Sequence, residues 1–361
     1  MSAGQLAVYA QGMVTAVGFD APTSCAAMRG GLSGLYEDNL WDILVGEYLS
    51  VGRPLMHQWW EGRDMLAELL APPILECVDA LASIPGWEHI DPRQVPIVVI
   101  VPPEHRPHRW EQLDTALLAD LAHKLGHPLA VYSSTIAGGR AGIVAALEVA
   151  AQLCGRAELP VCVIAGVESF MRQRLAVHYL RQRRMKSEVN SNGFVAGEAA
   201  SAILVGPARA ARAPQLLLTG VGWAEDPAGA GDSTAHPVTG RGLTAAIRQA
   251  LAQAGHSYAA LDLRLCDING EHWKFKESAF AEGRLDRARP EGLPARRLGY
   301  CDVWHPIELI GEVGAAVFPL LLGWLRDAYC KGYDRGPRSL VFAMEDAGER
   351  AAVTCEFWSP T

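Results

Sequence analysis

The sequence lacks the features that mark a membrane, secreted or nucleic-acid-binding protein. Nothing in its 361 residues approaches the run of about 18 apolar residues that a membrane-spanning helix needs. Its first residues lack a basic region followed by a long apolar stretch, so they do not predict a secretory signal. The formal net charge is −8, whereas a protein that binds nucleic acid through phosphates usually has a basic excess. We expect a cytoplasmic protein that binds neither membrane nor nucleic acid.

Closely spaced cysteines are also missing. The chain has eight cysteines but no CxxC pair, which argues against a zinc site or a disulfide framework. Several lie in apolar runs, where a free thiol behaves as a small hydrophobic side chain. We therefore expect reduced thiols, most of them buried, with no metal and no cofactor. The cysteines are Cys25, Cys77, Cys154, Cys162, Cys266, Cys301, Cys330 and Cys355.

What is present is the composition of a globular α/β protein. Half of the residues are hydrophobic and 20% are charged, which excludes a disordered chain. Apolar runs alternate with amphipathic stretches along the whole sequence. Strands are predicted at 5–10, 95–101, 129–132, 160–165, 199–205, 215–223, 263–269, 339–344 and 351–357. Helices are predicted at 22–29, 63–83, 109–125, 137–154, 241–254, 271–282 and 308–329.

The pattern of strands and helices restarts after a small, basic connector at 206–214 that ends in proline. We therefore expect two similar halves, 1–206 and 207–361. Strands that alternate with helices favour mainly parallel sheets covered on both faces.

Three segments resemble the β-ketoacyl synthase branch of the thiolase fold. The first is GMVTAVGFDAPTSCAAMRGGLSG at 12–34, which is similar to the opening strand, glycine turn and helix of that family. The second joins VCVIAGVESF at 161–170 to NSNGFVAGEAASAILVG at 190–206. The third joins DIN at 267–269 to IGEVGAA at 310–316. The resemblance implies a five-layered αβαβα thiolase fold with two pseudo-duplicated halves. It also implies a homodimer, with the strand expected at 129–132 pairing across a twofold axis.

The resemblance also implies a catalytic apparatus that this chain does not match. Family members use a cysteine thiolate at the N-terminus of a buried helix, together with two histidines. In register with that pattern, Ser134 takes the position of the cysteine, in the turn that enters the helix, and Glu271 and Glu308 take those of the histidines. A serine has no thiolate, and carboxylates oppose the oxyanion that forms during condensation. We expect none of these residues to be active in condensation.

Two neighbouring histidines leave a catalytic alternative open. His272 follows Glu271, and His305 lies three residues before Glu308. Either histidine could form a Ser–His–Glu arrangement with Ser134. The chain would then be an acyltransferase of the β-ketoacyl synthase type, transferring or hydrolysing acyl thioesters. The other interpretation gives both histidines structural roles.

A basic stretch at 171–186 is a candidate partner patch in an otherwise acidic protein. Because related synthases dock an acidic acyl carrier, the patch could bind one, or it could be a solvated helix face. Its basic residues are Arg172, Arg174, Arg181, Arg183, Arg184 and Lys186.

The substitutions favour a non-catalytic, ketosynthase-like pseudoenzyme that acts as a binding, chaperone or assembly component. NSNGFVAGEAA at 190–200 and WHPIELIGEVGAA at 304–316 are most similar to thiolase-like proteins encoded near bacterial type VI secretion effectors. That resemblance implies an effector or adaptor as the protein partner. A silent partner subunit of a synthase heterodimer, such as a chain-length factor, is a further alternative.

Overall fold

Two sets of strands with the same topology form the centre of the molecule. The computed structural model describes residues 5–56, 60–156, 160–230, 236–287 and 301–360. Ten of the described strands lie side by side in the order β10-β9-β11-β12-β8-β1-β7-β6-β4-β5. Their bounds are Leu6–Val14 (β1), Ile97–Val101 (β4), Ser134–Ala137 (β5), Cys162–Ser169 (β6), Ala196–Pro207 (β7), Gln215–Glu225 (β8), Leu263–Cys266 (β9), Asp302–Trp304 (β10), Arg338–Met344 (β11) and Glu349–Trp358 (β12).

The first set, β1-β7-β6-β4-β5, and the second set, β8-β12-β11-β9-β10, repeat one pairing scheme. In each set the first two pairings are antiparallel and the next two are parallel. The sets meet only where β1 pairs with β8, at Ala7–Leu217 and Val8–Leu216. The chain is therefore built from two sheets of equal topology, here called the first half and the second half.

Beyond its short pairing with β1, the edge of β8 that faces away from β12 forms hydrogen bonds with side chains instead of with a strand. The side-chain amide of Gln253 accepts a hydrogen bond from the backbone N–H of Val221 (3.0 Å) and donates one to its carbonyl (2.7 Å). Gln249 accepts a hydrogen bond from the N–H of Trp223 (3.1 Å). Both glutamines lie on α6, so this helix satisfies backbone groups that the divergence of the two sheets leaves unpaired.

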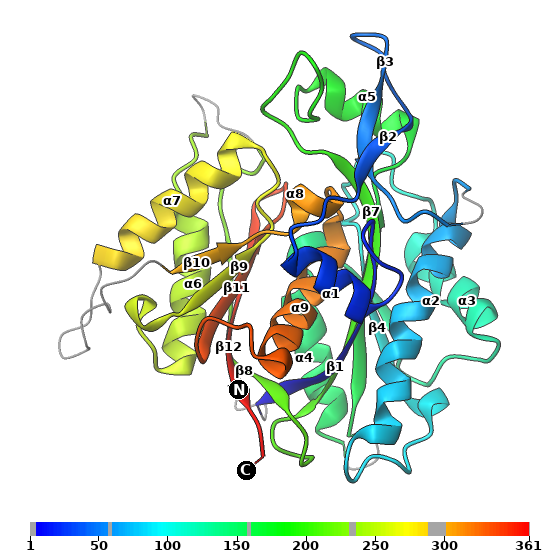
Figure 1. Ribbon diagram of the computed structural model, residues 1–361, viewed down its shortest axis with the longest axis vertical. Helices are drawn as coiled ribbons and strands as arrows, with labels where there is room; N and C mark the ends of the chain where they lie inside the picture. Colours follow the sequence, from blue (N-terminus) through cyan, green and yellow to red (C-terminus); the bar gives the residue numbers. More distant parts are fainter. Residues whose placement is uncertain (1–4, 57–59, 157–159, 231–235, 288–300, 361) are drawn as a thin grey trace.

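The helices complete five layers (Figure 1). On the outer face of the first sheet, α2 and α3 pack together, and on the outer face of the second sheet α6 and α7 do so. Between the sheets lie α1, α4 and α9. The αβαβα arrangement expected from the sequence is thus confirmed. Helix bounds are Ala21–Arg29 (α1), Arg63–Asp79 (α2), Leu113–Leu125 (α3), Ile143–Cys154 (α4), Gln173–Arg181 (α5), Arg241–Ala254 (α6), His272–Arg287 (α7), Ile307–Ile310 (α8) and Val317–Lys331 (α9).

The apolar runs in the sequence reflect sheets that are buried on both faces. In β4, Val98 and Ile100 enter the core between the sheets, whereas Ile97, Val99 and Val101 enter the core beneath α2 and α3. Successive side chains of a strand point to opposite faces, so both faces of β4 must be apolar. Six of the eight cysteines are buried, as predicted, whereas Cys301 is half-buried and Cys330 is exposed.

Two predicted elements are wrong. Residues 129–132 do not form a strand: the backbone turns at Val131 and Tyr132, and the edge strand is β5 at Ser134–Ala137. The helix predicted at 308–329 is broken into α8 and α9. Gly311 and Gly314 break it, with φ values of 76° and 49°, in the left-handed region that glycine readily adopts.

Other elements were not predicted. The strands β2 (Leu35–Asp42) and β3 (Glu47–Gly52) form a hairpin, and α5 packs beside it over a separate small core. The helix α2 also continues through Pro72 and Pro73, although a proline inside a helix removes a backbone hydrogen bond.

The close approach of β6 to the turn before α9 yields a stability prediction. A Cβ at Gly166 would lie 2.2 Å from the carbonyl oxygen of Ala315, so Gly166→Ala must push the sheet and this turn apart. We expect a loss of about 1–3 kcal/mol in the free energy of unfolding. In the control Gly283→Ala, on α7, the new methyl meets nothing within 4 Å. That variant should gain about 0.5–1 kcal/mol from helix propensity. Urea unfolding of both variants checks this, and an unchanged Gly166→Ala would contradict the packing.

Candidate functional site

Charged side chains fill the centre of the molecule, where the turns after β5, β9 and β11 meet the turns before α9. We call this group the central ion network. It comprises four basic residues and six acidic residues of the described chain, and eight of the ten are buried. The basic residues are Arg106, Arg140, Arg184 and Lys274, and the acidic residues are Glu168, Asp267, Glu271, Glu312, Glu345 and Asp346.

Arg140, in the turn between β5 and α4, is the middle of the network. Its side chain has no exposed surface. Its Nε donates to Oε1 of Glu312 (3.1 Å), and its Nη1 donates to Glu345 (3.0 Å) and Asp346 (3.2 Å). The backbone N–H of Arg140 donates to the other oxygen of Glu345 (2.8 Å). A planar guanidinium can satisfy several carboxylates at once, which a lysine ammonium could not do with the same geometry.

Two more arginines of the first half reach the same carboxylates. Arg106, in the loop after β4, contacts Glu168 (2.7 Å), Glu345 (3.1 Å) and Asp346 (2.9 Å). Arg184, which follows α5, donates two hydrogen bonds to Asp346, each 3.0 Å long. The carboxylates of Glu345 and Asp346 belong to the second half, so these ion pairs tie the halves together.

The loop after β9 completes the network. Arg184 binds Glu271 through two parallel hydrogen bonds of 2.7 and 3.0 Å. Asn269 donates to Glu312 (2.6 Å), and Lys274 forms a fully buried ion pair with Asp267. Fixed partners therefore hold this loop against the turn that carries Glu312.

The charge balance of the network explains the pKa directions of its carboxyl groups. Burial raises the pKa of Glu168 and Asp267, and the nearby Arg106 and Lys274 only partly offset it. For Glu345 and Asp346, burial acts in the same direction, but the surrounding arginines outweigh it and lower both pKa values. Asp267 binds Lys274 through Oδ2, whereas its Oδ1 is buried and accepts no hydrogen bond within the described chain.

The turn between β5 and α4 contains no nucleophile. Residues 138–142 read Gly-Gly-Arg-Ala-Gly, with no thiol and no hydroxyl. Gly139 has a φ of 52°, and a Cβ built there would lie 2.1 Å from Oε2 of Glu345. The carboxylate of Glu345 thus occupies the space that a side chain at this position would need.

The structure separates the three residues that the sequence aligned with a catalytic triad. The prediction that Ser134 lies in the turn is wrong: it begins β5, so Ala137 at the other end of this strand lies about 10 Å away. Glu271 lies in the network. Glu308 does not: its side chain is 64% exposed, and Glu312 supplies the buried carboxylate of that segment.

Neither histidine proposed as a replacement base contacts Ser134 in the described structure. His272 is exposed at the start of α7, where its backbone N–H donates to the side chain of Asn192 (2.7 Å). His305 is half-buried, and its Nδ1 lies 3.6 Å from a carboxylate oxygen of Glu308. These contacts favour local structural roles for both residues.

The basic stretch at 171–186 divides between the surface and the interior. Arg184 belongs to the central ion network, and Arg172 is held between Glu61 (2.9 Å) and the ring of Trp110 (3.6 Å to its centroid). Arg174, Arg181, Arg183 and Lys186 are exposed. The partner patch is therefore smaller than the sequence suggested.

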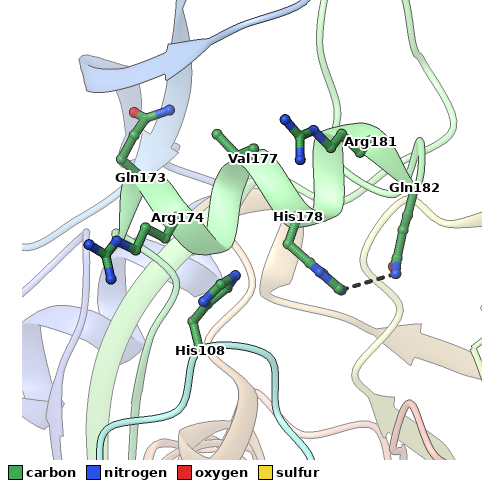
Figure 2. Close-up of a pocket in the computed structure, with 7 residues that line it drawn as sticks. All are labelled: His108, Gln173, Arg174, Val177, His178, Arg181 and Gln182. Carbon is green, nitrogen blue, oxygen red and sulfur yellow. Dashed lines mark hydrogen bonds between the residues drawn. The ribbon is translucent and has the colours of Figure 1, made fainter.

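Part of that exposed patch borders a shallow cleft of about 450 Å³ on α5 (Figure 2). His108, from the loop after β4, faces α5 beside His178, and the two ring centroids lie 6.1 Å apart. Arg174 and Arg181 point to different sides of the helix, so their charges do not converge on one point.

The described residues show neither a metal site nor a membrane span. They contain no group of three or more histidine, cysteine, aspartate or glutamate side chains that could hold a metal ion. No helix within the described ranges is long and apolar enough to cross a bilayer.

Sequence reasoning missed Arg106, Arg140, Glu312, Glu345 and Asp346. One signal for them was present, because Arg140 interrupts a stretch of small and apolar residues, and Glu345 and Asp346 directly follow a buried strand. An ionic side chain in such a segment must find a partner when it is buried.

The lowered pKa of Glu312 predicts acid-sensitive stability. Burial alone would raise its pKa, but Arg140 and Lys274 bring it to about 2, below the ordinary 4.5. A carboxyl whose pKa falls on folding stabilises the protein above the ordinary value, and this effect is lost as the pH drops toward the folded value. We expect Glu312 to contribute roughly 3 kcal/mol that disappears over this range.

Urea unfolding between about pH 3 and pH 7 checks this expectation. The free energy of unfolding of the unmodified chain should fall with acid, and that of Glu312→Gln should fall by roughly 3 kcal/mol less, since Glu345 and Asp346 keep their own acid dependence. The exposed control, Glu308→Gln, should follow the unmodified chain. Parallel profiles for the unmodified chain and Glu312→Gln would contradict the role of Glu312.

Comparisons with known proteins agree with this architecture. No family model and no curated protein matches the sequence. Among solved structures, a ketosynthase in complex with its chain length factor from Xenorhabdus doucetiae is 14% identical, with a TM-score of 0.73 and 98% of each chain covered.

Two further solved structures are similar. A type II polyketide synthase complex of an acyl-carrier protein with its ketosynthase is 12% identical, with a TM-score of 0.74 and coverage of 98% of this chain and 99% of that one. The ishigamide ketosynthase/chain length factor is 14% identical, with a TM-score of 0.72 and coverage of 99% and 100%. The chain therefore has the thiolase fold in the two-sheet form seen in ketosynthases and chain length factors.

Proposed function

We propose that this chain is a non-catalytic, ketosynthase-like protein. It would bind a protein partner and serve as a binding, chaperone or assembly component. The observation that carries the proposal is the central ion network. Arg140 lies in the turn before α4, and the carboxylate of Glu345 reaches into this turn, where the resemblance places the catalytic cysteine of a ketosynthase.

The electrostatics of the network also oppose condensation. The reaction needs a nucleophile activated at a helix N-terminus, and hydrogen-bond donors aimed at a developing oxyanion. At this turn the arginine donors are already bound to carboxylates, and Glu345 and Glu312 would repel a new negative charge. A charge network that is buried and internally paired favours a structural role for these residues.

A silent partner subunit of a synthase heterodimer is the second candidate. The similar solved structures include ketosynthases described together with their chain length factors, which supports this role. A partner subunit of this kind should form a stable heterodimer when co-expressed with an active synthase. A type VI secretion effector is a further proposal for the partner, supported by sequence resemblance alone.

An acylation assay tests the non-catalytic proposal against the transferase or hydrolase alternative. The purified chain is incubated with acyl-CoA and weighed intact. We expect no increment on Ser134, because Ser134 lies at the beginning of β5 and no described contact supplies it with a base. The exposed thiol of Cys330 could react chemically, so the assay is run on Cys330→Ser as well. An increment that maps to Ser134 and disappears in Ser134→Ala would overturn the proposal.

Self-association through the edge of the first sheet is a second part of the proposal. β5 is the last strand of that sheet, and Val131 and Tyr132, just before it, are 74% and 53% exposed. An unpaired strand edge beside exposed apolar residues favours pairing with a second chain.

Light scattering after size-exclusion chromatography tests this association. We expect a homodimer for the unmodified chain and a monomer for Val131→Asp, because the charge would be buried in the interface. Val189→Asp is a matched control, since Val189 is 69% exposed on a different segment. This control should remain dimeric. A monomeric unmodified chain would contradict the proposal.

A further inference from the structure

The β2–β3 hairpin extends from the body of the first half. It joins the main sheet only near its base, where Val51 and Gly52 pair with Ala196 and Gly197 of β7. In Figure 1 the hairpin lies at one end of the molecule, with α5 beside it. Its far end, the turn between Asp42 and Glu47, lies well away from the central layers.

This far end carries four exposed large apolar side chains within eight residues. Their exposed fractions are 38% for Trp41, 42% for Ile43, 54% for Leu44 and 55% for Tyr48. We call these residues the hairpin tip. Gly46, with a φ of 85°, and the side chain of Asp42 account for the turn itself, but neither requires the exposed apolar side chains of Ile43 and Leu44. Apolar side chains clustered on a surface in this way are typical of a contact site for another molecule.

The hairpin tip is held in one conformation. The buried side chain of Asp42 accepts a hydrogen bond from the N–H of Leu44 (2.8 Å). The rings of Trp41 and Tyr48 meet edge to face across the two strands, with centroids 4.9 Å apart. On the outer edge of β2, the amide of Gln173 bonds both the N–H (2.9 Å) and the carbonyl (2.8 Å) of Trp41. A rigid apolar surface loses little conformational entropy when it binds, which favours affinity.

Carboxylates adjoin the hairpin tip. Beside Tyr48 lies a cleft of about 370 Å³, lined among others by Glu37, Glu47 and Glu188. All three residues are exposed, and Lys186 is the one basic residue among the described residues that line this cleft. A partner that covers both features must offer apolar side chains with lysine or arginine beside them. The carboxylates also disfavour an anionic lipid surface.

We infer that the hairpin tip and its acidic cleft form a docking surface for a basic amphipathic segment of a partner protein. This inference rests on the proposed binding role and names the surface that would perform it. Trp41 and Tyr48 would provide rigid aromatic contacts, and Ile43 and Leu44 would provide the apolar contact. The glutamates would pair with the basic residues of the segment and so fix its position.

A synthetic peptide of defined chemistry tests the surface. The probe is a fluorescein-labelled amphipathic helix of leucine and lysine, and the charge control is a leucine–glutamate peptide of the same length. We expect fluorescence anisotropy to show saturable binding of the leucine–lysine peptide. The leucine–glutamate peptide should bind at least about tenfold more weakly, because like charges repel.

Substitutions locate the binding. Ile43→Ser with Leu44→Ser should weaken binding of the leucine–lysine peptide by at least about tenfold, since apolar contact is lost. Both side chains are exposed, so the melting temperature should not change, and thermal melts confirm that the variant is folded. The matched control is Leu32→Ser with Leu75→Ser, which removes two exposed apolar side chains elsewhere and should leave the affinity unchanged. Glu37→Lys with Glu47→Lys should reverse the preference between the two peptides.

Three results would overturn the inference. They are unchanged peptide binding in the Ile43/Leu44 variant, equal losses in that variant and in the Leu32/Leu75 control, and equal binding of the two peptides. Phosphatidylcholine vesicles provide a fourth test. Vesicle binding that is lost in the Ile43/Leu44 variant, with peptide binding unchanged, would assign the hairpin tip to a membrane instead. None of these results depends on the acylation assay, so failure of the docking surface and failure of the non-catalytic role are distinguishable.

Discussion

The ion pairs around Arg140 fix the positions of the turns that meet at the centre of the molecule. Arg140 lies in the turn that leads into α4, and the carboxylates that it binds follow β11 and precede α9 in the second half. Transfer of such charges from water costs several kcal/mol per ion, and the pairing recovers this cost only when every donor and acceptor is placed well. The need to place each donor and acceptor well fixes the relative position of the two sheets more narrowly than apolar packing alone could. Apolar contacts tolerate small shifts.

The same network fills the space at the start of α4 that loss of catalytic side chains alone would leave empty. Loss of a nucleophile and two histidines would leave a cavity, which destabilises a core in proportion to its size. Here long, charged side chains fill the space, and the carboxylate of Glu345 lies where a Cβ on Gly139 would stand. A side chain larger than hydrogen at position 139 would therefore require the carboxylate of Glu345 to move.

The fold could be predicted from the sequence to a greater extent than the site. Buried strands such as β4 and amphipathic helices such as α6 are defined by local patterns, and α6 has the predicted bounds. The strand predicted at 129–132 was misplaced because apolar residues there lie on the surface, while the true edge strand contains serine and threonine.

The site could not be predicted because its residues are brought together by contacts that no local sequence pattern reveals. Arg140 and Glu312 are 172 positions apart, and Arg140 and Glu345 are 205 apart, so their pairing follows from the tertiary structure alone. Glu308 was chosen over Glu312 because IELIG at 307–311 was placed in register with the second histidine phrase of the family, with Gly311 as its final glycine. The left-handed backbone of Gly311 ends α8 and turns the following carboxylate inward.

The glutamine side chains on α6 have a consequence for how the protein behaves when its halves move. Along the edge of β8, Gln253 replaces a neighbouring strand by satisfying both backbone groups of Val221. An open strand edge can recruit a strand from another molecule and start aggregation. Because these amides travel with α6 and β8, a transient separation of the two sheets would not uncover an adhesive edge here. At Val221, β8 therefore offers no unpaired backbone group to a strand of another molecule.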